Sequence, residues 1–135
     1  MVEPGNAREV EVTSEDSEYP IESALIPRNG QGWKAARPGS QGIRLFFDTP
    51  QRLQLIRAVF TEEHRSRMQE FVLRWSDGSH PSKEIVRQQY NFVAGSIEVE
   101  KYTVDLESVS ILELEIEPAK GSTRICASLT ELRLR

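Results

Sequence analysis

The sequence has few of the residues that build covalent cross-links and metal centres. Cys126 is the single cysteine among 135 residues, which excludes a disulfide within the chain and a cage of several thiolates. The two histidines, His64 and His80, are 16 residues apart and lack the close spacing of a zinc site on a helix. We therefore expect neither a metal nor a cofactor, and a reducing, cytoplasmic location.

Long apolar segments are also missing. No strongly apolar run exceeds three residues, as in Leu45–Phe47. Residues 1–8 contain nothing that resembles the apolar core of a signal peptide. We expect no membrane span and no export, because a spanning helix needs about 20 apolar residues in succession.

Basic residues are fewer than acidic ones, and they are unevenly distributed. The formal net charge is −4. Proteins that bind nucleic acid are typically basic, so we do not expect nucleic acid as a partner. Residues 1–20 contain six acidic residues and one arginine, whereas residues 21–91 contain eleven basic and seven acidic residues. We expect any anionic partner to meet the middle of the chain.

Runs of alternating apolar and polar residues recur along the sequence, whereas helical spacing is nearly absent. Pro20 and Pro27 bracket the one short predicted helix, at 21–26. Residues 36–42 and the pair Thr49 and Pro50 are predicted to interrupt the strands. The predicted strands are 10–12, 43–48, 52–60 with a bulge near Leu55 and Ile56, 71–75, 86–92, 102–106, 112–116 and 132–134.

This pattern predicts an all-β protein, an antiparallel jelly-roll β-sandwich of about eight strands, and excludes a parallel sheet with crossover helices. The length corresponds to a single domain. We divide it into residues 1–20, an acidic leader with the first strand, and residues 21–135, the jelly-roll domain.

Catalytic constellations are lacking. The loop 29–32 has two glycines but no preceding strand, which makes it a poor dinucleotide cradle. Ser76, Asp77 and His80 lie in one polar turn, unlike the dispersed residues that activate a serine. Glu113, Glu115 and other acidic residues alternate along one strand, as on a solvated sheet face. We do not expect an enzyme.

The order of segments resembles the discoidin family, the galactose-binding-like jelly rolls of the coagulation factor V/VIII C-domain type. Ala24 and Leu25 followed by Trp33 are similar to its short helix, loop and core tryptophan. The other matching stretches are 39–45 continuing through 48–56, Phe71–Gly78 with its final Ser-Asp-Gly turn, and the closing strand 127–134.

The resemblance implies ligand binding by loops at one end of the sandwich. Family members with a structural calcium carry oxygen ligands before the tryptophan, and those positions fall here on Ile26, Arg28 and Gln31. Isoleucine cannot coordinate calcium, and arginine repels it. Glu131 matches a late glutamate of the family, but a single carboxylate cannot supply the six to eight oxygen ligands that calcium takes. No calcium is expected.

The candidate ligand-binding side chains lie in three segments. Trp33 and Trp75 are assigned to the core. Arg65 and Arg67 are equally well explained as neutralising Glu62 and its acidic neighbours. The candidates are Arg28, Asn29, Lys34, Arg37, His64, Arg65 and Tyr90.

The resemblance implies a non-catalytic module that binds carbohydrate through these loops. Basic loops favour acidic or phosphorylated sugars, because charge-assisted hydrogen bonds are the strongest that a shallow site can make. The alternative is an intracellular protein–protein adaptor, for which an exposed Phe46 would be a sign. The oligomeric state stays open.

Overall fold

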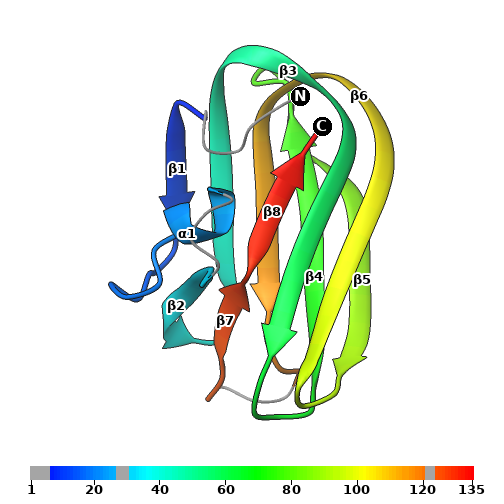
Figure 1. The fold of residues 1–135 in the computed structure, drawn as a ribbon. Helices are drawn as coiled ribbons and strands as arrows, with labels where there is room; N and C mark the ends of the chain where they lie inside the picture. The colour runs from blue at the N-terminus through cyan, green and yellow to red at the C-terminus, as the bar shows by residue number, and fades with distance from the viewer. Residues whose placement is uncertain (1–6, 27–30, 121–123) are drawn as a thin grey trace.

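The computed structural model describes residues 7–26, 31–120 and 124–135. This part of the chain contains one short helix and eight strands, all of whose named pairings are antiparallel (Figure 1). The all-β prediction is confirmed. The elements are β1 Glu9–Val12, α1 Glu22–Leu25, β2 Trp33–Pro38, β3 Gln41–Glu62, β4 Arg67–Ser76, β5 Lys83–Phe92, β6 Ser96–Glu117, β7 Cys126–Leu129 and β8 Glu131–Leu134.

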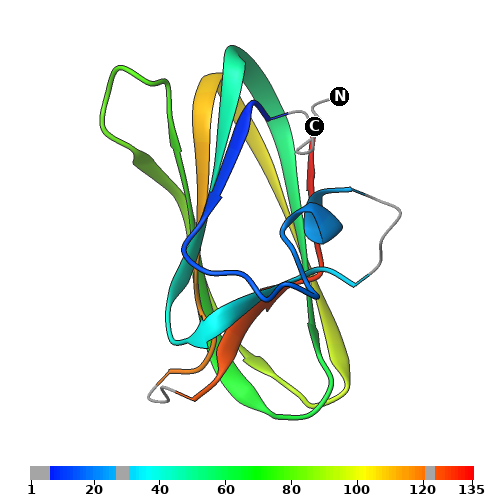
Figure 2. The ribbon, with the colours of Figure 1, turned by 90° about the vertical axis from the view of Figure 1, so that its left-hand side faces the viewer.

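Two long strands make the sandwich. β3 and β6 each have 22 residues, pair with one another, and arch over the top of Figure 1 from one layer to the other. The main sheet has the order β1-β3-β6-β4-β5, and β8 pairs with the second half of β3. Turned by 90°, the molecule shows its two layers from the side (Figure 2).

The predicted breaks within these strands are wrong. Residues 43–48 and 52–60 belong to β3, and residues 102–106 and 112–116 belong to β6. The strand continues through Pro50 because the register is irregular from Phe46 to Gln51, where the absent N–H of proline interrupts no regular ladder. A further shift between Leu53 and Leu55 adjoins the predicted bulge.

Residues 36–38 were predicted as part of a loop, but they belong to β2, which pairs with β7 in a separate two-stranded ribbon. The closing segment is two strands, not one. The N–H of Thr130 donates to the carbonyl of Val59 at 2.8 Å, so the chain turns from the ribbon at β7 into the main sheet at β8.

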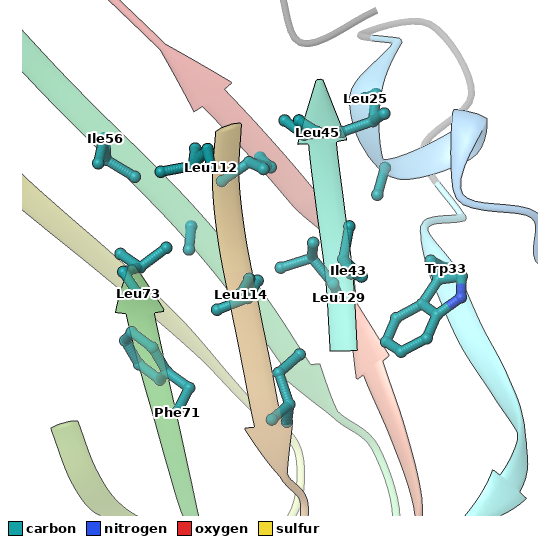
Figure 3. Close-up of a cluster of buried hydrophobic side chains, with 14 of the residues drawn as sticks. Leu25, Trp33, Ile43, Leu45, Ile56, Phe71, Leu73, Leu112, Leu114 and Leu129 are labelled. Carbon is teal, nitrogen blue, oxygen red and sulfur yellow. The ribbon is translucent and has the colours of Figure 1, made fainter. Parts of the chain in front are cut away.

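The apolar side chains on one face of each strand pack together in one core. Figure 3 shows Ile43 and Leu45 of β3 beside Leu112 and Leu114 of β6, and each of them is at most 2% exposed. Burying one such side chain stabilises the fold by roughly 1.5–3 kcal/mol. Trp33 is 1% exposed, which confirms its assignment to the core.

Aromatic side chains join the two layers near the end where β3 leads to β4. The ring centroids of Phe60 on β3 and Phe71 on β4 are 5.2 Å apart. Tyr90 and Phe92 of β5 extend this cluster, each within 6.4 Å of Phe60. Between residue 7 and residue 135, the described helices include none that is long and apolar enough to cross a membrane.

Candidate functional site

A hollow of about 480 Å³ lies at the end of the sandwich where β3 leads to β4 and β7 begins, the lower end in Figure 1. Three segments that are distant in sequence form most of its walls, and Tyr19 adds to the lining. The segments are residues 31–34 before and within β2, residues 61–67 from the end of β3 to the start of β4, and residues 124–130 around β7.

The first wall depends on a glycine. Gly32 has a φ of 75°, in the left-handed region that side chains disfavour. A Cβ atom at this position would lie 2.5 Å from the carbonyl oxygen of Leu129 and 2.7 Å from the Cα of Thr130. Only glycine therefore lets the segment before β2 approach the β7–β8 corner this closely.

The second wall is shaped by an ion pair between Glu62 and Arg67. Their Oε1 and Nε atoms are 2.6 Å apart. The other carboxylate oxygen of Glu62 accepts hydrogen bonds from the backbone N–H groups of His64 at 2.9 Å and Arg65 at 3.3 Å. Burial opposes ionisation, but these hydrogen bonds outweigh it, so the pKa of Glu62 lies below its ordinary value.

Arg67 supports this loop from inside the protein. Arg67 is 9% exposed, and its guanidinium lies 4.6 Å from the centroid of the Phe92 ring. Nη1 also donates to Oε1 of Gln69 at 2.7 Å and to the carbonyl of Pro118. The side-chain N–H groups of Arg67 thus bond other parts of the protein, so Arg67 positions the loop. Arg65, in contrast, is exposed to solvent.

The third wall is tied to the second through two threonines. The hydroxyl of Thr130 donates to that of Thr61 at 2.8 Å. Ser128 of β7 pairs with Lys34 of β2, and the thiol-bearing Cys126 is exposed on the same strand. The ribbon of β2 and β7 is thus fixed against the end of β3.

A cation and an aromatic ring lie together in the hollow. Nζ of Lys34 is 4.2 Å from the centroid of the Tyr19 ring, a cation–π contact. Tyr19 is held in place because its carbonyl accepts a hydrogen bond from the N–H of Lys34 at 3.1 Å. The site thus presents a positive charge that lies over an aromatic ring, and the polar side chains around it suit the hydroxyl and anionic groups of a sugar.

The structure brings together three of the seven predicted site residues. Lys34, His64 and Arg65 line the hollow. Arg37 lies outside its lining, and Nη2 of Arg37 donates to the carbonyl of Thr13 at 2.8 Å. Arg28 and Asn29 fall outside the described residues.

Tyr90 is placed elsewhere. Its hydroxyl accepts a hydrogen bond from Nε2 of Gln69 at 2.8 Å, and its ring packs against Phe92 with centroids 5.0 Å apart. Burial, reinforced by the carboxylate of Glu100, raises the pKa of Tyr90. Tyr90 thus belongs to the aromatic cluster rather than to the lining of the hollow.

Sequence reasoning missed Tyr19, Arg124 and Ser128, which also line the hollow. Tyr19 lies in the segment assigned to an acidic leader, and only its pairing with β2 brings it here. Ser128 was assigned to the closing strand. Its alternation places it correctly on a strand, but nothing local indicates that this strand pairs with β2.

Two arginines, not a metal ligand set, surround Glu131, the glutamate that matches the family pattern. Oε1 of Glu131 is 3.3 Å from Nη1 of Arg57 and 3.0 Å from Nε of Arg133. Gln31 lines the hollow and Ile26 is an exposed apolar residue. Among the described residues, no group of three His, Cys, Asp or Glu side chains is arranged to hold a metal ion.

The turn with Ser76, Asp77 and His80 does not form a catalytic triad. Nδ1 of His80 lies 2.8 Å from Oδ2 of Asp77. The Ser76 hydroxyl donates to the backbone carbonyl of His80 at 2.9 Å, so the imidazole does not receive its proton. These contacts close a turn.

A second hollow, of about 750 Å³, crosses β1, β3, β6 and β4. Its cations are already paired. Arg44 lies 3.7 Å from Glu11 and 3.0 Å from Glu113, and Arg74 lies 3.9 Å from Glu115. These distances join side-chain nitrogen and carboxylate oxygen atoms, and the ladder they form matches the charged sheet face predicted from the sequence.

An exposed Phe46 would favour a protein-binding adaptor. Phe46 is half-buried, with the guanidinium of Arg44 at 6.0 Å from its ring centroid. In the described ranges, the exposed large apolar residues include Ile97 and Val99, which share one face of β6 and are not among the residues that line the hollow.

Neither a protein-family model nor a curated protein matches the sequence. Solved structures do match. A family 32 carbohydrate-binding module of AlyQ, in complex with 4,5-unsaturated mannuronic acid, gives a TM-score of 0.72 at 12% identity over 96% of this chain and 95% of that one. A pectin-binding carbohydrate-binding module gives 0.72 at 14% identity over 96% and 90% of the two chains.

The family 32 module of NanJ from Clostridium perfringens, in complex with galactose, gives a TM-score of 0.66 at 13% identity over 98% of this chain and 96% of that one. These similarities establish the fold. The predicted antiparallel jelly-roll β-sandwich is confirmed.

Proposed function

We propose that the chain is a discoidin-like, non-catalytic module that binds a glycan in the hollow formed by residues 31–34, 61–67 and 124–130. One observation carries the proposal. Lys34 and Tyr19 place a cation over an aromatic ring in a concave site at the loop end of the sandwich.

The chemistry of the walls suits sugar hydroxyls. The lining includes the hydroxyls of Thr61 and Ser128, the amide of Gln31 and the guanidinium of Arg65, which supply both donors and acceptors. The site is open and polar, so we expect modest affinity for one sugar and a gain when several sites meet a repeating glycan.

The structural neighbours support this function. The modules of similar fold were solved with 4,5-unsaturated mannuronic acid and with galactose, and another is described as pectin-binding. Fold alone does not determine function, so the residues of the hollow must decide it.

A glycan array with the purified chain tests the function, and Cys126 tests the location. The exposed thiol of Cys126 lines the hollow and is the single cysteine of the chain. A glycan that binds in the hollow should slow alkylation of Cys126 by uncharged iodoacetamide. Binding without protection would move the site elsewhere.

Two alanine variants complete this test. Lys34→Ala should weaken binding, whereas Arg37→Ala, on the same strand but outside the lining, should leave it unchanged. If the array stays silent and the chain instead captures a protein through the face with Ile97 and Val99, the adaptor alternative takes its place.

A further inference from the structure

The hollow has more positive than negative side chains. Its cationic lining residues are Lys34, Arg65, Arg67 and Arg124, and its acidic ones are Glu62 and Glu63. This excess is local, since the chain as a whole has a net charge of −4. An anionic ligand would therefore find a positive site on an otherwise acidic protein.

The two acidic side chains are already engaged. Glu62 bonds Arg67 through one oxygen and two backbone N–H groups through the other. Oε2 of Glu63 lies 3.5 Å from Nε2 of His64. Neither carboxylate forms an ion pair with the side chain of Lys34 or Arg65.

Lys34 and Arg65 are cations of the lining whose side chains have no carboxylate close by in the described residues. Within residues 7–26, 31–120 and 124–135, no carboxylate oxygen lies within 4.0 Å of either side chain's nitrogen atoms. Both residues are exposed. The ammonium of Lys34 contacts only a neutral ring, and the backbone of Arg65 is fixed by Glu62.

We propose that the glycan bound in this hollow is anionic, and that Lys34 and Arg65 bind its carboxylate or sulfate group. The inference rests on the proposed function and specifies its ligand class. A guanidinium presents paired N–H donors to a planar carboxylate, and an ammonium adds a point charge. The Tyr19 ring lies under the Lys34 ammonium and holds it at the wall of the hollow.

Calorimetric titration with three oligosaccharides tests this inference. Oligogalacturonate carries carboxylates, its fully methyl-esterified form has the same sugars without charge, and a sulfated galactan oligosaccharide carries sulfate. We expect an anionic oligosaccharide to bind at least about tenfold more tightly than the ester, since one charge-assisted hydrogen bond contributes enough for that factor. Its affinity should fall as salt is added.

Charge-removing variants locate the effect. Lys34→Gln and Arg65→Gln should each lose about tenfold in affinity for the anionic oligosaccharide and little for the ester. Lys101→Gln is the matched control, because Lys101 is exposed on β6 away from the hollow. It removes the same charge and should leave both affinities unchanged.

The outcomes separate the inference from the function beneath it. Equal binding of oligogalacturonate and its ester, unaffected by Lys34→Gln and Arg65→Gln, would overturn the anionic ligand while retaining glycan binding. Silence with all three oligosaccharides and on a glycan array would overturn the proposed function, and this inference with it. Preference for carboxylate or for sulfate supports the inference and identifies the group.

Discussion

Nη1 of Arg133 donates a hydrogen bond to the carbonyl oxygen of Leu25 at 3.1 Å. Leu25 ends the short helix α1, and the same nitrogen lies 3.4 Å from the carbonyl of Ala24. Nε of Arg133 pairs with Glu131, which also pairs with Arg57. A guanidinium on β8 therefore satisfies the end of α1 and holds it against the sandwich.

Replacing Arg133 with Met should lower the free energy of unfolding by about 1.5–3 kcal/mol, the contribution of hydrogen bonds from a charged group. Arg52→Met is the control, because Arg52 forms an exposed ion pair with Asp105 at 2.9 Å. That pair should contribute at most about 1 kcal/mol. Urea unfolding measures both variants, and equal losses would contradict the role given to Arg133.

Calcium should not stabilise this protein. Arg57 and Arg133 flank Glu131 at 3.3 and 3.0 Å, so two positive charges accompany the one carboxylate that the family pattern assigns to the metal. We expect the same melting temperature with calcium and with a chelator, since a ligand stabilises only a fold that binds it. A melting temperature that rises with calcium concentration would show that the folded protein binds calcium and would contradict this prediction.

The Glu62–Arg67 pair should be strongly coupled. The side chains are 13% and 4% exposed, so Arg67→Met leaves a largely buried carboxylate without its partner and should cost about 3–5 kcal/mol. Adding Glu62→Gln should recover part of that loss. A double-mutant cycle by urea unfolding measures the coupling, and additive losses would mean that the pair does not shape the loop.

Asp77 should make stability depend on acid. The backbone N–H of Ser79 and the ring of His80 bond its carboxylate and lower its pKa to about 2. A carboxylate with a lowered folded-state pKa stabilises above its unfolded value, near 3.8, and this contribution is lost as the pH falls towards 2.

Thermal unfolding of the protein and of Asp77→Asn follows this effect. The gap between their melting temperatures should be largest near neutral pH and should close between about pH 4 and pH 2. A gap that stays constant over this range would show that the charge of Asp77 is not what stabilises the turn.

Alternation is a local signal, and it predicted the sandwich well. Each apolar phase, such as Ile43 and Leu45, faces the core whatever the strand's partner. Strand ends were predicted less well, because continuation through Pro50 depends on how β3 pairs with β6. The two-stranded ribbon was missed because it joins Trp33 to Leu129 across most of the chain.

The site was predicted in part for the same reason. His64 and Arg65 lie in one turn, so their placement needed only the ends of β3 and β4. Arg37 follows Lys34 by three residues on a strand, which separates side chains that a loop could have gathered. Tyr19 reaches the hollow only through backbone pairing with Lys34, which no local pattern indicates.

Backbone amide resonances followed while oligogalacturonate is added show whether the hollow beside β2 and β7 binds an anionic glycan. We expect the largest changes on Lys34, Arg65 and Ser128 and on their neighbours in the three walls. Changes centred instead on Arg74 and Glu115, in the second hollow, would contradict it.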